Sequence, residues 1–198
     1  MDDSVLQWKL VRKMMWVVRA GQGSIFYQKY IDAKRVYLPW NGYSVDLNSF
    51  ETKTQFRTIV ESEKQTTNKT SLSNWTGQLI SFVKEIHPGD YVLIPTRDSH
   101  SYSLTRITGG YEFDLSDVDG LFHSRMIDVI WENIPRDIFT QEIIYSLGAF
   151  RTLFKVKHEE VVLHAISKWL ASEISMSVSL QRSEESSKCE RSIFKNLH

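Results

Sequence analysis

Residues 86 to 93 read IHPGDYVL, and the hydrophobic pattern of the chain changes at this stretch. Before it, the apolar residues of 71–86 recur at helical spacing, which predicts an amphipathic helix that ends at Pro88-Gly89. After it, 91–96 and 101–108 are rich in β-branched and aromatic residues, which predicts two strands joined by a turn at residues 98–100. The stretch therefore predicts a junction between a helix and a β-hairpin.

The remaining elements follow from the same kind of pattern. The dense apolar run 14–20, closed by Gly21-Gln22-Gly23, is typical of a buried strand. Further strands are predicted over 126–134 and 150–156, and further helices over 49–64, 140–148 and 158–174. Gly109-Gly110 predicts a break after the second strand of the hairpin. Together they predict the α+β class, as a small β-barrel or a strongly curved mixed sheet flanked by helices.

The end of the chain differs in composition from the rest. From Ser175 onward it is rich in serine and alternates charge, which favours a linker or a disordered tail. We therefore divide the chain into a domain over 1–156, a C-terminal helix over 157–174 and a tail over 175–198.

Charge and cysteine content narrow the functional classes. The 24 Lys and Arg balance 24 Asp and Glu, so the whole chain carries no net positive charge that would attract a polyanion. Residues 1–40 carry seven basic and three acidic side chains and 111–142 carry two and eight, which predicts two ends of opposite charge, the basic one suited to phosphates. Cys189 is the only cysteine, which excludes a disulfide framework. The lack of a signal pattern or a long apolar span predicts a cytoplasmic protein without a membrane partner.

Trp40 is the most unusual aromatic residue of the sequence. Pro39 restricts the chain before it to extended geometry, and Asn41-Gly42 behind it is a strong turn signal. A large indole at the end of a strand is a candidate wall of a pocket, with packing under the turn as the alternative. Trp75 occupies an apolar position of the 71–86 helix, which favours the core, and its neighbour Asn74 is placed to cap or orient a loop.

Several blocks together resemble a known superfamily. Ile86-His87-Pro88-Gly89-Asp90-Tyr91-Val92-Leu93, followed by Leu104-Thr105-Arg106-Ile107-Thr108-Gly109, resembles the Pro-Gly-Asp, strand, hairpin, strand-Gly core of PUA-like domains, which include EVE and YTH domains. The resemblance is closest to the PUA-like N-terminal domain of Mrr-type restriction proteins, and it covers roughly residues 14–156. Three further blocks stand where that family's blocks would: 16–21, 74–79 and 145–150.

The resemblance implies a reader of nucleic acid rather than a catalyst. EVE-like and YTH domains hold an extruded and often modified base in an aromatic-walled pocket, and an aromatic face returns about 1–3 kcal/mol of lost stacking. By this resemblance Trp40 forms one wall, and the strand end at Arg19 to Gly21 offers backbone polar groups to the base edge. The full expected nucleic-acid-binding set is Arg19, Ala20, Gly21, Lys34, Arg35, Trp40, Asn41, Tyr43, Asn74, Trp75, Arg97 and His100.

The sequence motifs that would indicate an enzyme are weaker than those that indicate a reader of nucleic acid. Glu51-Thr52-Lys53 fits the E-x-K end of a restriction-nuclease core, with Asp32 or Asp46 upstream, but it lies at a predicted helix start instead of a central strand. His158 and His164 are spaced six residues apart, where a zinc-protease helix needs four. We therefore expect no catalytic centre, no metal and no cofactor.

Two functional hypotheses remain open. The first is a modified-DNA reader, the recognition module of a modification-dependent, type IV-like restriction or phage-defence protein, whose nuclease lies on a downstream domain or a partner chain. The second is an RNA-binding or protein-interaction PUA-like domain without a nuclease effector.

Overall fold

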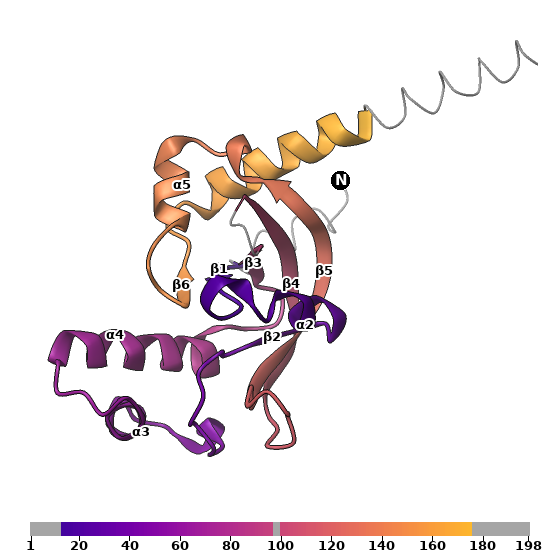
Figure 1. Ribbon diagram of the computed structural model, residues 1–198. Helices are drawn as coiled ribbons and strands as arrows, with labels where there is room; N and C mark the ends of the chain where they lie inside the picture. The colour runs from indigo at the N-terminus through magenta and orange to yellow at the C-terminus, as the bar shows by residue number, and fades with distance from the viewer. Residues whose placement is uncertain (1–12, 97–99, 176–198) are drawn as a thin grey trace, which may run out of the picture.

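The computed structural model describes residues 13–96 and 100–175 (Figure 1). These residues form an α+β fold, as the sequence predicts. The elements in chain order are β1 (Met15–Val18), η1 (Gln22–Ser24), α2 (Tyr27–Asp32), β2 (Arg35–Tyr37), η2 (Leu47–Ser49), α3 (Lys53–Lys64), α4 (Lys69–Ile80), η3 (Ser81–Glu85), β3 (Tyr91–Pro95), β4 (Ser101–Phe113), β5 (His123–Pro135), η4 (Arg136–Ile138), α5 (Gln141–Leu147) and β6 (Leu153–Lys155). A last helix occupies residues 159–175. The predicted tail lies almost entirely outside the described residues.

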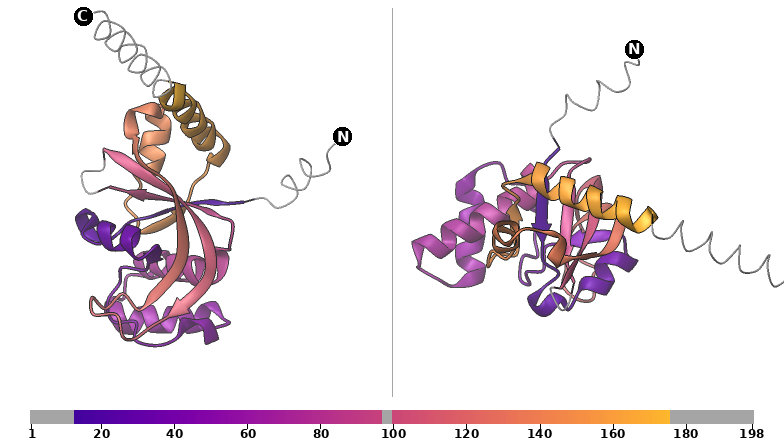
Figure 2. Two further views of the ribbon diagram at one scale, coloured as in Figure 1. Left: turned by 90° about the vertical axis from the view of Figure 1, so that its right-hand side faces the viewer. Right: turned by 90° about the horizontal axis from the view of Figure 1, so that it is seen from above.

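The strands form one open mixed sheet. Its order is β2-β5-β4-β3-β1-β6, in which β1 and β3 are parallel and the other neighbours antiparallel. Because β2 and β6 are separate edges of the described sheet, it does not close into the barrel that was one of the two expected forms. Figure 2 shows β4 and β5 bending strongly along their length, which agrees with the other form, a curved mixed sheet.

Both faces of the central strands are covered. Alternate residues of β1 enter different cores: Trp16 and Val18 join one hydrophobic cluster, and Met15 and Val17 join the other. Figure 1 shows α3 and α4 on one side of the sheet and α5 with the last helix on the other. Val162 and Ile166 of the last helix belong to the second cluster, so this helix shares its core with the sheet. Burial on both faces explains why β1 reads as a continuous apolar run.

The Pro-Gly-Asp stretch precedes β3 and holds this strand against its parallel neighbour β1. Gly89 adopts a φ of 97°, a left-handed conformation that glycine tolerates best. The buried Asp90 carboxylate then accepts three hydrogen bonds, from the Met14 backbone N–H (2.9 Å), the Trp16 indole Nε1 (3.0 Å) and the His87 backbone N–H (3.1 Å). One side chain thus fixes the start of β3 against the start of β1.

Side-chain caps set the boundaries of α3 and α4. Thr52 and Gln55 form a capping box, so α3 begins at Lys53, later than the predicted start at residue 49. Asn68 accepts hydrogen bonds from two backbone N–H groups of the next turn, so α4 begins at Lys69, two residues before its predicted start. The second of these helices contributes one wall of the site described below.

The predicted break at Gly109-Gly110 is wrong. Strand β4 continues through both glycines to Phe113, and its register against β5 shifts between Ile107 and Tyr111. A Cβ at Gly109 would lie 3.1 Å from the Cβ of Met126, so a glycine lets the two strands approach here. These residues mark an irregularity within the sheet instead of the end of a strand.

The predicted separation into a basic and an acidic end is also wrong. The two segments pack together and neutralise each other: the Lys29 Nζ lies 2.5 Å from a carboxylate oxygen of Asp117 and 2.6 Å from one of Asp119. The Arg35 guanidinium lies 2.7 Å from a carboxylate oxygen of Glu112. Lys29 and Arg35 are therefore engaged within the chain, and positive charge for a ligand has to come from other basic residues.

His123 is a buried histidine whose two ring nitrogens both have hydrogen-bond partners. Its ring lies between those of Tyr111 and Phe113, with centroid separations of 5.8 and 5.3 Å. The Tyr111 hydroxyl accepts a hydrogen bond from the Leu47 N–H and lies 2.7 Å from His123 Nδ1, to which it donates when the imidazole is neutral with its hydrogen on Nε2. His123 Nε2 then donates to the Tyr43 carbonyl oxygen at 2.7 Å. Burial lowers the pKa of His123 below its ordinary value.

We expect this histidine to make folding stability depend on pH. Because its pKa is lower in the folded than in the unfolded chain, the unfolded chain binds more protons as the pH falls below about 6.5. The stabilisation is therefore complete above that pH and is lost as the pH falls toward the folded pKa. Urea unfolding of the wild type and His123→Gln across this range measures it. An equal slope of stability against pH in both proteins would contradict the assignment.

Candidate nucleic-acid interface

A cavity of about 830 Å³ opens where the carboxyl ends of the parallel strands β1 and β3 meet α4 and the segment that follows α5. Its charged lining is one-sided: three arginines, Arg19, Arg136 and Arg151, and no Asp or Glu among the described lining residues. Its aromatic lining comprises Trp75, Tyr102 and Phe150. A chain without net charge thus concentrates positive charge in one concave site.

Arg19 builds one wall of this cavity. Its Nε donates to the Arg151 carbonyl oxygen at 3.0 Å, and its NH2 nitrogen donates to those of Ala149 at 3.2 Å and Leu147 at 3.4 Å. The Arg19 backbone N–H also donates to the Thr152 carbonyl oxygen at 2.8 Å. Burial lowers the pKa of Arg19, although the group remains a cation at neutral pH. This side chain therefore holds the segment after α5 against the end of β1.

The other two arginines keep their guanidinium groups available. Neither side chain makes an ion pair or a hydrogen bond within residues 13–96 and 100–175. Arg136 is positioned by its backbone, because its N–H donates to the His100 carbonyl oxygen at 2.9 Å. Two unpaired guanidinium groups in a concave site suit an anionic group such as a phosphate.

The turn after β1 shapes the entrance and uses much of its own backbone. The Ala20 carbonyl oxygen accepts from the Phe26 N–H at 3.0 Å, and that of Gly21 accepts from the Ser24 N–H at 3.2 Å. The Ser24 hydroxyl in turn donates to the Pro95 carbonyl oxygen at the end of β3, at 3.1 Å. A Cβ at Gly21, whose φ is 80°, would lie 2.8 Å from the Phe26 ring, so only glycine fits without movement. The carbonyls of Ala20 and Gly21, which were expected to meet a base, already accept bonds within this loop.

One face of α4 supplies polar groups to the cavity. Ser71, Asn74, Trp75 and Gln78 all line it, and their spacing places them on one side of the helix. The Gln78 Oε1 accepts from the Leu153 N–H at 2.9 Å, while its NH2 group has no hydrogen bond to the described residues. The Asn74 amide likewise has none in this part of the chain. Both side chains retain donors, and Asn74 retains an acceptor, for a ligand.

The aromatic lining differs in exposure. Trp75 is half-buried, Phe150 is fully exposed, and Tyr102 is buried with its ring in an edge contact with Phe139 at 5.9 Å between centroids. Burial raises the pKa of Tyr102, so its hydroxyl stays protonated at neutral pH. Trp75 is therefore partly accessible in the cavity and held at a fixed position on a helix.

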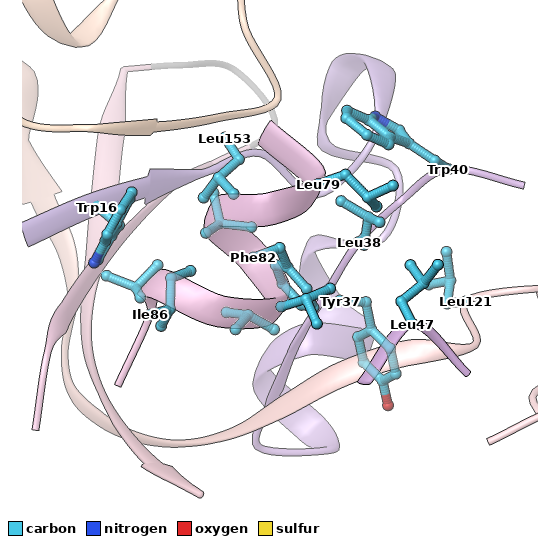
Figure 3. Packing of buried hydrophobic residues seen from close by; sticks show 14 of the residues in the cluster. Trp16, Tyr37, Leu38, Trp40, Leu47, Leu79, Phe82, Ile86, Leu121 and Leu153 are labelled. Atoms are coloured by element: carbon cyan, nitrogen blue, oxygen red, sulfur yellow. The ribbon is translucent and has the colours of Figure 1, made fainter. Parts of the chain in front are cut away.

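Trp40 does not line this cavity, and the expectation that its indole forms a wall of the pocket is wrong. The side chain is only 8% exposed and belongs to the main hydrophobic cluster, with Leu38 and Leu79 beside it in Figure 3. Its Nε1 donates to the Thr152 hydroxyl at 3.2 Å. Thr152 and Pro39 do line the cavity, so Trp40 supports the wall from behind. The turn at Asn41-Gly42 folds against α3, whose Glu63 carboxylate would collide with a Cβ at Gly42.

Three aromatic rings surround one lysine next to the cavity. The Lys64 Nζ lies 5.4 Å from the ring centroid of Trp40, 5.8 Å from that of Tyr43 and 5.7 Å from that of Trp75. Burial lowers the pKa of Lys64. The sequence-predicted aromatic residues Trp40, Tyr43 and Trp75 are therefore brought together, around a cation of the same chain.

The structure places the other predicted residues elsewhere. Lys34 and Arg35 lie at the β2 edge, where Arg35 is paired with Glu112. Exposed Asn41 lies in the turn near Gly120, and exposed His100 touches the site only through its carbonyl bond to Arg136. Arg97 lies outside the described residues. The residues that sequence reasoning missed are Ser71, Gln78, Tyr102, Arg136, Phe150 and Arg151.

Other kinds of site were also considered. The residues that the structure describes include no group of three or more His, Cys, Asp or Glu placed to hold a metal ion. Glu51 and Lys53 flank the Thr52 cap at the start of α3, which confirms that this E-x-K tripeptide lies at a helix start. Within the described ranges, no helix combines the length and apolar character needed to cross a membrane.

Comparison with known families identifies the chain only at the level of a family. A family model described as a domain of unknown function (DUF8426) matches residues 15–153, so the chain belongs to this family. The match includes β1, α4 and all of the cavity lining described above. No curated protein matches the sequence.

Proposed function

We propose that this chain is a nucleic-acid reader that holds one extruded, modified base of DNA in the arginine-lined cavity. The observation that carries the proposal is the lining itself, three arginines without an acidic residue beside a half-buried tryptophan. The volume of about 830 Å³ lies within the usual range of ligand pockets, about 300–1,000 Å³. The positive charge favours a phosphate, and the aromatic lining favours a base.

The lining offers each contact that an extruded nucleotide needs. Arg136 and Arg151 present unpaired guanidinium groups for phosphate oxygens, which Arg binds in a bidentate manner. The Asn74 and Gln78 amides provide hydrogen bonds for a base edge, as these side chains do in other nucleic-acid complexes. Trp75 offers a ring face on which a base that has left the duplex regains about 1–3 kcal/mol of stacking.

The resemblance to the PUA-like N-terminal domains of Mrr-type proteins extends the proposal to the biological role. On this basis the chain is a PUA-like, EVE/YTH-like recognition module of a modification-dependent restriction or phage-defence protein. The nuclease then resides on another domain or a partner chain, and this chain binds without cleaving.

The experiment compares short duplexes that carry one 5-methylcytosine, 5-hydroxymethylcytosine or N6-methyladenine with the unmodified duplex. We expect at least one modified duplex to bind more tightly, and Arg136→Gln to weaken that binding by about 1.5–3 kcal/mol, the usual contribution of a hydrogen bond to a charged group. Arg57→Gln, which removes the same charge from α3 outside the cavity, should bind as the wild type does. Fluorescence anisotropy at fixed salt measures both.

Three outcomes would overturn the proposal in different ways. Equal loss in the Arg57 and Arg136 variants would show that binding ignores the cavity. Tighter binding of single-stranded RNA than of every duplex would favour the RNA-binding alternative. Strand breakage with Mg²⁺ or Mn²⁺ that disappears in Lys53→Ala would show that the chain is itself a nuclease.

A further inference from the structure

A second, larger depression adjoins the cavity along α4. It has a volume of about 1170 Å³ and runs between α4 and the segment 151–157, which includes the edge strand β6. Five basic residues line it against two acidic ones, Glu85 and Glu159. The basic ones are Lys53, Lys69, Arg151, Lys155 and Lys157. We call this depression the lysine groove.

The four lysines of the groove have no ion-pair or side-chain hydrogen-bond partner among residues 13–96 and 100–175. All are exposed. This contrasts with the basic residues near the N-terminus, where Lys29 and Arg35 are paired with carboxylates. A set of unpaired lysines along one groove attracts a polyanion, because each contact with a phosphate releases condensed counterions.

The groove is continuous with the arginine-lined cavity. Asn74, Gln78 and Arg151 line both, so the two depressions meet along one face of α4. A nucleic-acid strand that lies in the groove therefore continues directly into the cavity. The shared residues include a guanidinium and two amides, which suits the point where a backbone turns one nucleotide out of its path.

We propose that the lysine groove is the track for the phosphate backbone of the strand whose extruded nucleotide occupies the cavity. The inference rests on the proposed nucleic-acid function. It adds the path of the strand across the surface: the lysines bind the flanking phosphates, and the cavity binds one nucleotide. It places these phosphates at the β6 edge of the sheet. The predicted contacts at Lys34 and Arg35 lie at the opposite edge, five strand spacings or about 24 Å away along the sheet.

The experiment measures affinity against salt concentration for two probes, a short single-stranded oligonucleotide and a nucleoside monophosphate. Lys69→Gln combined with Lys155→Gln removes two groove charges. For the oligonucleotide we expect the slope of log K against log salt to fall by about 1.4, which corresponds to about 25-fold weaker binding near 0.1 M salt. The matched control is Lys34→Gln with Lys168→Gln, which removes two exposed lysines that line neither depression.

The groove variant should bind the monophosphate as tightly as the wild type does, because one nucleotide does not reach the groove. If the monophosphate binds but the oligonucleotide binds no tighter, or if both double variants lose equal affinity for the oligonucleotide, the groove is not the track although the proposed function stands. If neither probe binds, both proposals fail. If polyglutamate binds as tightly as the oligonucleotide with the same dependence on Lys69 and Lys155, the groove is a site for acidic protein instead of nucleic acid.

Discussion

Asp90→Ala should destabilise the fold by about 3–5 kcal/mol. The substitution removes the acceptor of three hydrogen bonds and leaves the Met14 and His87 N–H groups and the Trp16 indole without their partner. Each buried donor that loses its partner costs about 1–3 kcal/mol. For a chain of this size the loss corresponds to a fall of roughly 10 °C or more in the thermal midpoint. Chemical and thermal unfolding measure both quantities.

A surface carboxylate provides the control for this substitution. Asp128 lies on β5 with its nearest oxygen 3.6 Å from an Arg106 nitrogen, and both side chains are exposed. Such pairs contribute about 0–1 kcal/mol, so Asp128→Ala should leave the midpoint almost unchanged. Equal effects of the two substitutions would show that the Pro-Gly-Asp junction does not hold β1 against β3.

The secondary structure was predictable where hydrophobic period and local signals agree. The run 14–20 is a central strand, and the period change at Pro88-Gly89 marks the passage from α4 and η3 to β3. The errors lie where tertiary contacts override a local signal. Gly109-Gly110 is a turn signal in the sequence, but pairing with β5 carries the strand through it. Residues 47–49 form a separate 3-10 turn capped by Asp46, and α3 begins only after the Thr52 capping box, so the predicted start at residue 49 was too early.

The site was less predictable than the fold because several distant segments assemble it. Its arginines come from the position directly after β1, from η4 and from the segment after α5, so counting charge along the chain missed their convergence. The same counting favoured residues 1–40, whose Lys29 and Arg35 are paired with carboxylates more than 70 positions away. Arg19, Gly21, Asn74 and Trp75 were identified from the residues and the resemblance, and the structure brings these four to one cavity. Gln78 has a sequence signal in retrospect, since it lies one helical turn after Asn74.

The two tryptophans beside Lys64 separate packing from binding. Trp40→Ala should cost about 3–5 kcal/mol of stability, because a buried indole leaves a cavity that its neighbours fill only partly. Trp75→Ala removes a half-buried ring from the cavity lining, so it should cost less stability and weaken binding of the tightest modified duplex by about 1–3 kcal/mol. The two variants are matched controls, since each removes one indole that contacts the same Lys64 ammonium.

The measurement is the thermal midpoint and the affinity for that duplex on the same sample of each variant. We expect the midpoint to fall strongly in Trp40→Ala, while its folded fraction retains most of the wild-type affinity because the Trp40 ring supports the Thr152 wall without lining the cavity. The opposite pattern, a preserved midpoint with lost affinity in Trp40→Ala, would place this indole on the ligand. Unchanged affinity in Trp75→Ala would show that no base stacks on α4, and the bound nucleotide would then have to be held by the arginines alone.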